Sequence, residues 1–336
     1  MPPARFYVTT PIYYVNDRPH VGHAYTTVLA DVLAGYHRML GLPTWFLTGT
    51  DEHGQKVQDS AQARGIPPQQ LCDETAQHYR DLFARLEVRY DDFIRTTEPR
   101  HTAIVAKVLA ELHARGEIYL GSYEGWYCTR CERYWTDKDV AERGGGRCPD
   151  QPELHDVTRL AEENYYFRMS RHAAALRERI ADGSLAILPE KGRNEVRGFL
   201  AQEATDLCIS RSRERLSWGV PLPFDDRFVC YVWVDALFNY KSAIGYLADE
   251  ASERERHARW WPADVHLIGK DILTTHSIYW PTLLLALGEE LPRRILAHGW
   301  LLDPRGGKLS KTKRADDAAG TERPAPTIKG LLDVFG

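Results

Sequence analysis

The sequence has no hydrophobic run long enough to cross a bilayer, because its longest apolar stretch, around residues 283–287, is far too short. It also opens without a charged-then-apolar leader, and residues 5–10 look like a first strand instead. We therefore expect a cytoplasmic protein with no membrane partner. With 43% hydrophobic residues, 27% charged residues and a mean hydropathy of -0.45, the composition is typical of a soluble globular protein and excludes the collagenous and disordered classes.

An excess of positive charge is also missing, since 43 Lys and Arg stand against 47 Asp and Glu, for a net charge of -4. The chain as a whole therefore shows no electrostatic signature of nucleic-acid binding. Cysteine is scarce, but Cys128-x-x-Cys131 followed by Cys148 has the spacing of a metal site rather than of disulfides in a cytosolic chain. A reduced, metal-free turn is the alternative.

Strand and helix patterns alternate along most of the 336 residues, which favours a parallel, doubly wound sheet. One predicted helix, over about 22–40, carries Val28, Val32 and Tyr36 on one face. The alternation breaks over 121–159, where Gly, Cys and charged residues indicate a small loop-dominated module. Predicted strands cover 5–10, 44–48, 93–96, 228–234, 265–268 and 294–297. Of the other predicted helices, one ends near 65, one begins at 67–68, one begins at 235 and one spans 271–287.

The first strand-to-helix turn contains His20-Val21-Gly22-His23, and ligands of open parallel sheets bind at such turns. A helix N-terminus offers amide groups and partial positive charge to a phosphate, and Gly22 lets a nucleotide approach the backbone. The two imidazoles could donate hydrogen bonds to an oxyanion as its charge grows. A pair of histidines that binds a metal or merely caps the helix is the alternative.

A second candidate, Lys308-Leu309-Ser310-Lys311-Thr312, follows two glycines near the end of the sequence. Two lysines on a flexible loop suit a pyrophosphate leaving group, whose charge must be neutralised as it departs. A short basic loop can also be ordinary solvated surface. Its pairing with the histidine motif at the other end of a doubly wound domain favours a nucleotide site.

These two motifs resemble the HIGH and KMSKS signatures of the class I aminoacyl-tRNA synthetases. The segments 10–16, 48–54, 231–236 and 269–272 resemble motifs of the methionyl-tRNA synthetase family, so the resemblance covers essentially the whole chain. It implies a Rossmann-type α/β enzyme that activates methionine with ATP. Methionyl-adenylate and pyrophosphate would form first, and the aminoacyl group would then pass to tRNA(Met).

The resemblance implies a methionine pocket built mainly from apolar and aromatic residues. A polarizable thioether favours aromatic walls, and a polar edge from Tyr14 or His276 would help to reject aliphatic competitors. Without the family, these side chains would be read as ordinary core. Asp51 stands where a carboxylate receives the substrate ammonium group, although it could also be a helix N-cap. The residues at the pocket positions are Ile12, Tyr14, Val232, Trp233, Ala236, Tyr240, Ile272, His276 and Trp280.

Other family roles concern ATP. The catalytic residues implied are His20, His23, Lys308 and Lys311. Mg²⁺ is expected to bridge the ATP phosphates rather than to occupy an all-protein cage. The residues implied in ATP binding are His20, Gly22, His23, Gly269, Asp271, Lys308, Ser310 and Lys311.

The inserted module resembles the family's connective segment with its zinc knuckle, and it is too small for the editing domain of the isoleucine, valine and leucine enzymes. Three cysteines match the zinc ligands, but Asp150 and Gln151 occupy the fourth position, and a neutral amide is a poor zinc ligand. His155 or Asp150 could complete a tetrahedron. The predicted ligands of a structural zinc are Cys128, Cys131, Cys148 and His155.

The predicted organisation has four parts. They are a first half of the catalytic sheet over 1–115, a connective insertion with the Cys cluster over 116–225, a second half over 226–305, and a KMSKS-like loop with the start of a stem-contact fold over 306–336. The family's anticodon-binding domain is expected to be missing or supplied by a separate chain. Two alternatives are a synthetase-like core that aminoacylates a non-tRNA acceptor, and a non-catalytic module that binds methionine or a nucleotide.

Overall fold

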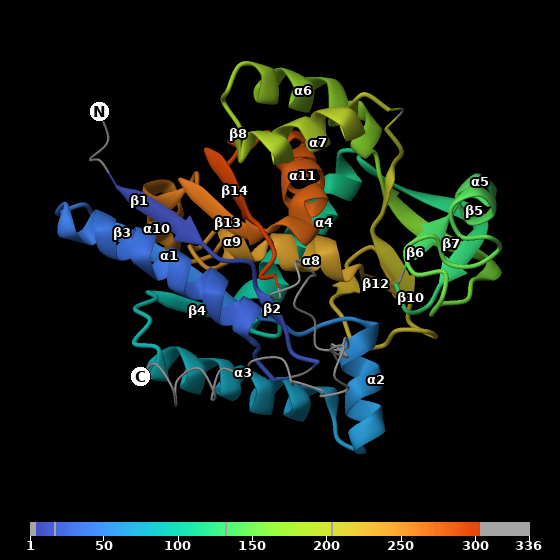
Figure 1. Cartoon of the computed structure of the whole chain (residues 1–336), viewed down its shortest axis with the longest axis horizontal. Coiled ribbons are helices and arrows are strands. Elements are labelled where there is room, and N and C mark those ends of the chain that lie inside the picture. The colour runs from blue at the N-terminus through green and yellow to red at the C-terminus, as the bar shows by residue number, and fades with distance from the viewer. Residues whose placement is uncertain (1–4, 17, 132, 203, 303–336) are drawn as a thin grey trace, which may run out of the picture.

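The computed structural model describes residues 5–16, 18–131, 133–202 and 204–302 (Figure 1). No helix in this part of the chain combines the length and the apolarity that a membrane crossing needs. The strands are β1 Phe6–Thr9, β2 Tyr13–Tyr14, β3 Thr44–Asp51, β4 Asp92–Arg95, β5 Ile118–Cys128, β6 Arg133–Trp135, β7 Thr158–Phe167, β8 Ala186–Leu188, β9 Leu207–Cys208, β10 Ser210–Ser212, β11 Pro221–Leu222, β12 Asp225–Cys230, β13 Val265–Gly269 and β14 Arg294–His298. The α-helices are α1 Val21–Met39, α2 Gln55–Arg64, α3 Pro68–Arg85, α4 Pro99–Ala114, α5 Asp137–Glu142, α6 Ala173–Ala181, α7 Glu190–Leu200, α8 Val232–Leu237, α9 Asn239–Ser242, α10 Ala251–Trp260 and α11 Trp280–Leu287.

A parallel sheet of seven strands forms the centre of the described chain, in the order β2-β3-β1-β13-β14-β8, with β4 also paired to β3. β1 lies between β3 and β13, so that Val8 is opposite Phe46 on one side and Val265 on the other. Parallel pairing of this kind arises where strands are joined by crossover helices. The predicted α/β sheet is confirmed, and it gains β8 from the segment predicted as the insertion.

The side chains of β1 alternate between the two faces of this sheet. Phe6 and Val8 contact Ala30 and Ala34 of α1, whereas Tyr7 belongs to the larger core on the opposite face. The small alanine side chains let α1 lie close to the strands. α1 is thereby held with its N-terminus at the edge where the strands end.

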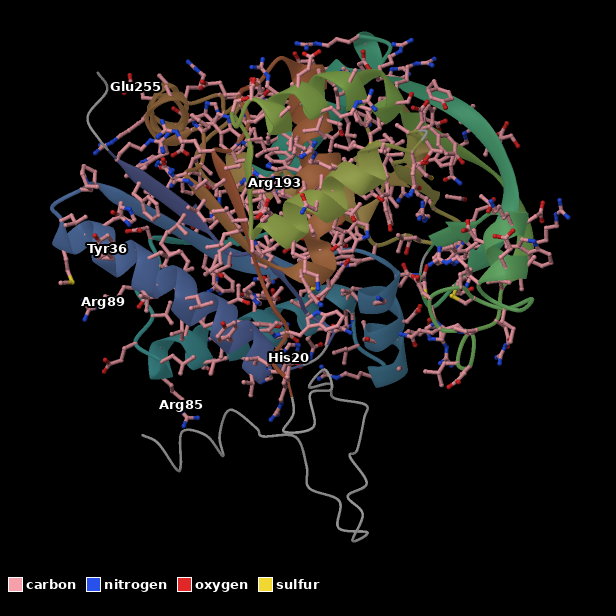
Figure 2. All side chains as sticks on the ribbon, turned by 45° about the horizontal axis from the view of Figure 1, so that its top comes forward. His20, Tyr36, Arg85, Arg89, Arg193 and Glu255 are labelled. Atoms are coloured by element: carbon pink, nitrogen blue, oxygen red, sulfur yellow. The ribbon has the colours of Figure 1, made fainter. Side chains whose placement is uncertain are left out.

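The face of α1 that carries Val28, Val32 and Tyr36 points to solvent. These residues are 39%, 62% and 58% exposed, respectively, and Figure 2 shows Tyr36 on the outer side of the molecule. Their spacing is that of a buried helical face. The helix instead buries the face with Ala30 and Ala34, and Leu29 and Leu33 pack partly buried against the same core.

The inserted module contains a four-stranded antiparallel sheet, in the order β6-β5-β7-β9, where loops were predicted. β5 and β7 pair along nearly their whole length, from Ile118 opposite Phe167 to Tyr127 opposite Thr158. In Figure 1, this sheet and α5 lie at the side of the molecule away from α1. The Cys-rich turns are thus carried on a rigid sheet.

Two predicted elements of the second half differ in the structure. Residues 228–234 were expected as one strand followed by a helix from 235, but β12 ends at Cys230 and α8 begins at Val232. β12 pairs antiparallel with β10 and β11 in a separate three-stranded sheet. The helix expected over 271–287 is divided into the 3₁₀ turn Lys270–Ile272, the π-helical turn Thr275–Tyr279 and α11. α11 begins where Pro281 occupies the first helical turn, the position that tolerates proline.

Candidate active site

The carboxyl ends of the central strands meet at one edge of the parallel sheet, which is where such folds bind ligands. β3 ends at Asp51, β13 at Gly269 and β14 at His298. Tyr14 is the pairing partner of Asp51 where β2 joins β3. α1 begins at this same edge with His20 as its N-cap, as Figure 2 shows.

His20 and His23 together cap the N-terminus of α1. Nδ1 of His20 accepts a hydrogen bond from the backbone N–H of Gly22 at 3.1 Å, and Nδ1 of His23 accepts one from the backbone N–H of His20 at 3.3 Å. The two rings stack with their centroids 3.6 Å apart. A Cβ at position 22 would lie 3.0 Å from Cε1 of His20, so glycine makes room for the folded ring.

This capping also bears on which nitrogen of each neutral ring carries the proton. A backbone N–H that donates to Nδ1 favours the tautomer with the proton on Nε2, in both histidines. The hydroxyl of Tyr79, 2.9 Å from Nδ1 of His23, adds a second donor there. His20 and His23 therefore do cap the helix, as the alternative had it. Their capping also orients two Nε2–H donors at the positive end of the helix, where an anionic phosphate would be stabilised.

Three of the predicted pocket residues, Tyr240, His276 and Trp280, form one buried aromatic cluster. The Tyr240 hydroxyl donates to Nε2 of His276 at 2.7 Å, and Nδ1 of His276 donates to the Ile272 carbonyl at 2.9 Å. The Tyr240 and Trp280 rings are 5.9 Å apart. Burial lowers the pKa of His276 to about 4, so its imidazole is neutral at pH 7.

Tyr14 and Trp233 form a second aromatic pair, edge to face with their centroids 6.0 Å apart. Val232, at the start of α8, lies against Gly54, since a Cβ at position 54 would be 3.4 Å from Cβ of Val232. Gly54 has a φ of +105°, a backbone conformation that residues with a Cβ atom rarely adopt. Of the other predicted pocket residues, Ala236 is buried and Ile12 and Ile272 are partly buried against the main core.

Asp51 is only 2% exposed and is the last residue of β3. Since the N-cap of α2 is Gly54, the helix-cap alternative for Asp51 is wrong. Gly49, two residues earlier, lets β3 approach β4, because a Cβ there would lie 2.0 Å from the carbonyl oxygen of Ile94. Close strand packing therefore determines where this carboxylate emerges.

A buried carboxylate that the sequence analysis missed connects two of the motifs. Asp235 accepts a hydrogen bond from Nδ1 of His53 at 2.6 Å and from Nε2 of His101 at 2.9 Å. Burial by itself raises the pKa of Asp235, but the two imidazoles outweigh it and hold the pKa at about 2. The bridge joins the loop after Asp51 to the helix that carries Trp233. The only signal in the sequence was that His53 and Asp235 lie inside the two motif segments.

β14 ends beside the first turns of α1. Nε2 of His298 lies 2.7 Å from the Thr26 hydroxyl, and a Cβ at position 269 would lie 3.7 Å from the His298 ring. Asp271, just after Gly269, accepts a hydrogen bond from the Trp300 indole. The structure therefore brings the turn at Gly269 close to the histidine signature, through a histidine that no motif indicated.

The predicted pyrophosphate loop, with Lys308, Ser310 and Lys311, lies outside the described residues.

The predicted metal ligands gather at the end of β5. The ligand atoms of Cys128, Cys131, Cys148 and His155 all lie within 4.8 Å of one another. Nδ1 of His155 is 3.2 Å from Sγ of Cys131 and 3.8 Å from Sγ of Cys128. Three thiols and one imidazole in this arrangement form a donor set that fits tetrahedral Zn²⁺. Of the two candidates for the fourth ligand, His155 is the one found in the cluster.

The sequence matches the model of the family described as "tRNA synthetases class I (M)" over residues 6–156 and 152–316. The chain belongs to this family. Curated methionine–tRNA ligases of Caldanaerobacter subterraneus subsp. tengcongensis and Thermotoga maritima are each 45% identical over 92% of this chain, with 47% and 48% of their own lengths matched. The ligase of Streptomyces coelicolor is 46% identical over 91% of this chain and 56% of its own length. This class I chain thus spans about half the length of these relatives.

Solved structures show the same similarity. The chain aligns with Mycobacterium tuberculosis methionyl-tRNA synthetase in complex with methionyl-adenylate at a TM-score of 0.83 and 40% identity, over 92% of this chain and 59% of that one. The free form of the same enzyme aligns at a TM-score of 0.73 and 38% identity, over 88% and 56% of the two chains. The class I fold is therefore shared along nearly the whole of this sequence.

Proposed function

We propose that this chain activates methionine with ATP and transfers the methionyl group to tRNA(Met). The observation that carries the proposal is the histidine cap of α1 at the same strand edge as Asp51 and the Tyr240–His276 pair. Membership of the family and the similarity to an enzyme solved with methionyl-adenylate support it. The proposed setting is the cytoplasm.

The residues at this edge have distinct roles in the proposed reaction. Asp51 receives the substrate ammonium group, and the aromatic residues around Tyr240 surround the thioether. The methionine carboxylate attacks the α-phosphate of ATP in line, and pyrophosphate leaves. His20 and His23 donate from Nε2 to the phosphate oxygens as their charge grows, so catalysis consists of positioning and electrostatic stabilisation. Gly269 and Asp271 would hold the nucleotide, and Mg²⁺ bound with ATP would supply charge neutralisation for its phosphates.

Three residues outside the described part of the chain belong to the same proposal. Lys308 and Lys311, with Ser310 between them, would neutralise the pyrophosphate as it departs. In the second step, a 3′-terminal hydroxyl of tRNA(Met) would take the aminoacyl group from the adenylate. We propose that efficient charging needs the anticodon-binding part of the family, on this chain or on a separate one.

The test of activation is methionine-dependent ATP–pyrophosphate exchange, compared with leucine, with cysteine and with no amino acid. Exchange with methionine alone supports the proposal. Absence of exchange with bound methionine or nucleotide would favour the non-catalytic module instead. Transfer from isolated methionyl-adenylate to tRNA(Met), against small-molecule and carrier acceptors, then separates a tRNA ligase from a core with another acceptor.

We also propose that the Cys128 cluster holds one structural Zn²⁺. Its chemistry would be purely structural, since four protein ligands leave no open position for a substrate. Metal analysis of the purified chain should give one zinc per molecule, and Cys148→Ser should lose it. Cys208→Ser, at a cysteine outside the cluster, is the matched control. A zinc-free native chain would contradict the proposal.

A further inference from the structure

Tyr79 occupies an unusual place for a residue outside every motif. It lies in the middle of α3, is fully buried, and follows His23 by 56 residues in the sequence. Its hydroxyl is 2.9 Å from Nδ1 of His23 and 3.4 Å from the carbonyl oxygen of Tyr14. A helix with no assigned function thus reaches both the histidine signature and the strand that borders the proposed methionine pocket.

The direction of the Tyr79–His23 hydrogen bond follows from the other contact of that nitrogen. The backbone N–H of His20 can only donate, and it points at Nδ1 of His23 from 3.3 Å. Nδ1 is therefore an acceptor, and the single proton of the Tyr79 hydroxyl is donated to it at 2.9 Å rather than to the Tyr14 carbonyl at 3.4 Å. Two donors at one nitrogen disfavour the tautomer with Nδ1–H.

The rings around this contact hold its geometry. Tyr13 stacks parallel to Tyr79, with centroids 5.4 Å apart and planes within 6°, and it also contacts the His23 ring at 4.7 Å. The Tyr13 hydroxyl is 2.7 Å from that of Thr27 in α1. Packed aromatic rings have few alternative rotamers, so the Tyr79 hydroxyl stays aimed at His23.

We propose that Tyr79 is a positioning residue for adenylate formation, which holds His23 in the tautomer whose Nε2–H faces the reacting phosphate. Tyr79 does not touch the substrate and acts only through His23. The inference rests on the proposed function, because the donor role of His23 matters only if a phosphate reacts there.

The decisive experiment is a double-mutant cycle in full-length protein, read as methionine-dependent ATP–pyrophosphate exchange. Tyr79→Phe should lower kcat about tenfold, the factor that corresponds to one neutral hydrogen bond, and leave KM for methionine unchanged. In a His23→Ala background, Tyr79→Phe should have no further effect, because the residue through which it acts is gone. Tyr90→Phe removes a hydroxyl from the same aromatic cluster, without reaching His23, and should retain full activity.

The cycle also excludes a merely structural role. If Tyr79→Phe lowered activity equally with and without His23, or if Tyr90→Phe had the same effect, the proposal would be overturned. Thermal unfolding of each variant provides the check on folding. If Tyr79→Phe fails to fold, Tyr79→His keeps a hydrogen-bonding ring at the position and should restore more activity to the folded protein than Tyr79→Leu.

A measurement that needs no turnover separates this proposal from the proposed function. The ¹⁵N shifts of the His23 ring, assigned by comparison with His23→Asn, should show the proton on Nε2 in the wild type and a mixture of tautomers in Tyr79→Phe. An unchanged tautomer in Tyr79→Phe would overturn the positioning role. A chain that shows the tautomer change but no exchange would disprove the proposed function alone.

Discussion

Histidine has several distinct physical roles in this chain, although the residue type is the same. At the start of α1, His20 and His23 are caps whose Nδ1 atoms accept backbone hydrogen bonds. In the aromatic cluster, His276 is a neutral ring between a hydroxyl donor and a carbonyl acceptor. His53 and His101 instead flank a buried carboxylate. The contacts, rather than the sequence, decide which role each one has.

His23→Ala is expected to slow adenylate formation on the order of 10²-fold, because it removes one oxyanion donor. Methionine binding should change little, since His23 does not belong to the aromatic pocket. Single-turnover adenylation and methionine affinity measure the two effects. Met39→Ala, on the same helix and 88% exposed, is the control and should match the wild type. An unchanged turnover number in His23→Ala would exclude its proposed role.

Residue-level prediction from sequence succeeded where chemistry is local and failed where it depends on tertiary contacts. His155 could be proposed as a ligand because it follows the third cysteine closely, and the structure places it in the cluster. Asp235, Tyr79 and His298 have no local pattern, since their partners lie far away in sequence. Val28, by contrast, had the spacing of a buried residue yet is exposed, because α1 packs on the sheet through the neighbouring face with Ala30 and Ala34.

At the scale of elements, one ion pair between a buried lysine and a partly exposed glutamate joins α9 to the segment just after α11. Nζ of Lys241, whose side chain is fully buried, lies 2.5 Å from Oε2 of Glu289 and 3.6 Å from the centre of the Tyr246 ring. Burial lowers the pKa of Lys241 to about 8, although Glu289 opposes that shift. Breaking such a pair from one side leaves a buried charge without compensation.

Glu289→Gln is therefore expected to lower the free energy of unfolding by about 3 kcal/mol at pH 7. Lys241→Met in the same chain should restore most of this loss, because no charge remains buried. The effect should shrink as the pH rises above about 8, where Lys241 of the folded protein loses its proton. Urea unfolding at pH 7 and pH 9 measures both. Glu290→Gln, at the exposed neighbour, is the control, and an equal loss there would contradict the assignment.

At the scale of the molecule, burial holds histidines in the neutral form: His266 and His276 are buried, and His257 is half-buried. Burial lowers the pKa of His257 and His276 to about 4 and that of His266 well below its usual value. An unfolded histidine titrates near 6.5, so below that pH the unfolded chain binds more protons than the folded one. The sign of the linkage is then fixed: stability falls as the pH decreases from 6.5 towards 4.

The chain is expected to lose about 1.4 kcal/mol of stability for each such histidine and each pH unit below 6.5. Chemical denaturation at pH 7, 6 and 5 checks this. His257→Phe should reduce the slope by one histidine's share, whereas Ala258→Ser, at an exposed position of the same helix without a titratable group, should leave it unchanged. A stability that stays constant from pH 7 to pH 5 would contradict the prediction.

The fold was more predictable than the site. Strand–helix alternation with short connections predicts a parallel sheet, and the structure has β1, β3, β13 and β14 where they were expected. The separate pairing of β12 could not be predicted, because an apolar run does not specify its partner strand. The site residues in motifs were found, but the contacts that orient them, such as Tyr79 on His23, come from helices with ordinary amphipathic sequences.

The pairing of β1 has a consequence for how the protein is made. Thr9 and His266 lie in contact although 257 residues separate them, so one edge of β1 stays open on the ribosome until β13 has left the exit tunnel. The antiparallel module, whose strands are near neighbours in the chain, can form during that interval. Translation that stalls before β13 therefore yields a nascent chain with an exposed strand edge, which chaperones must shield from aggregation.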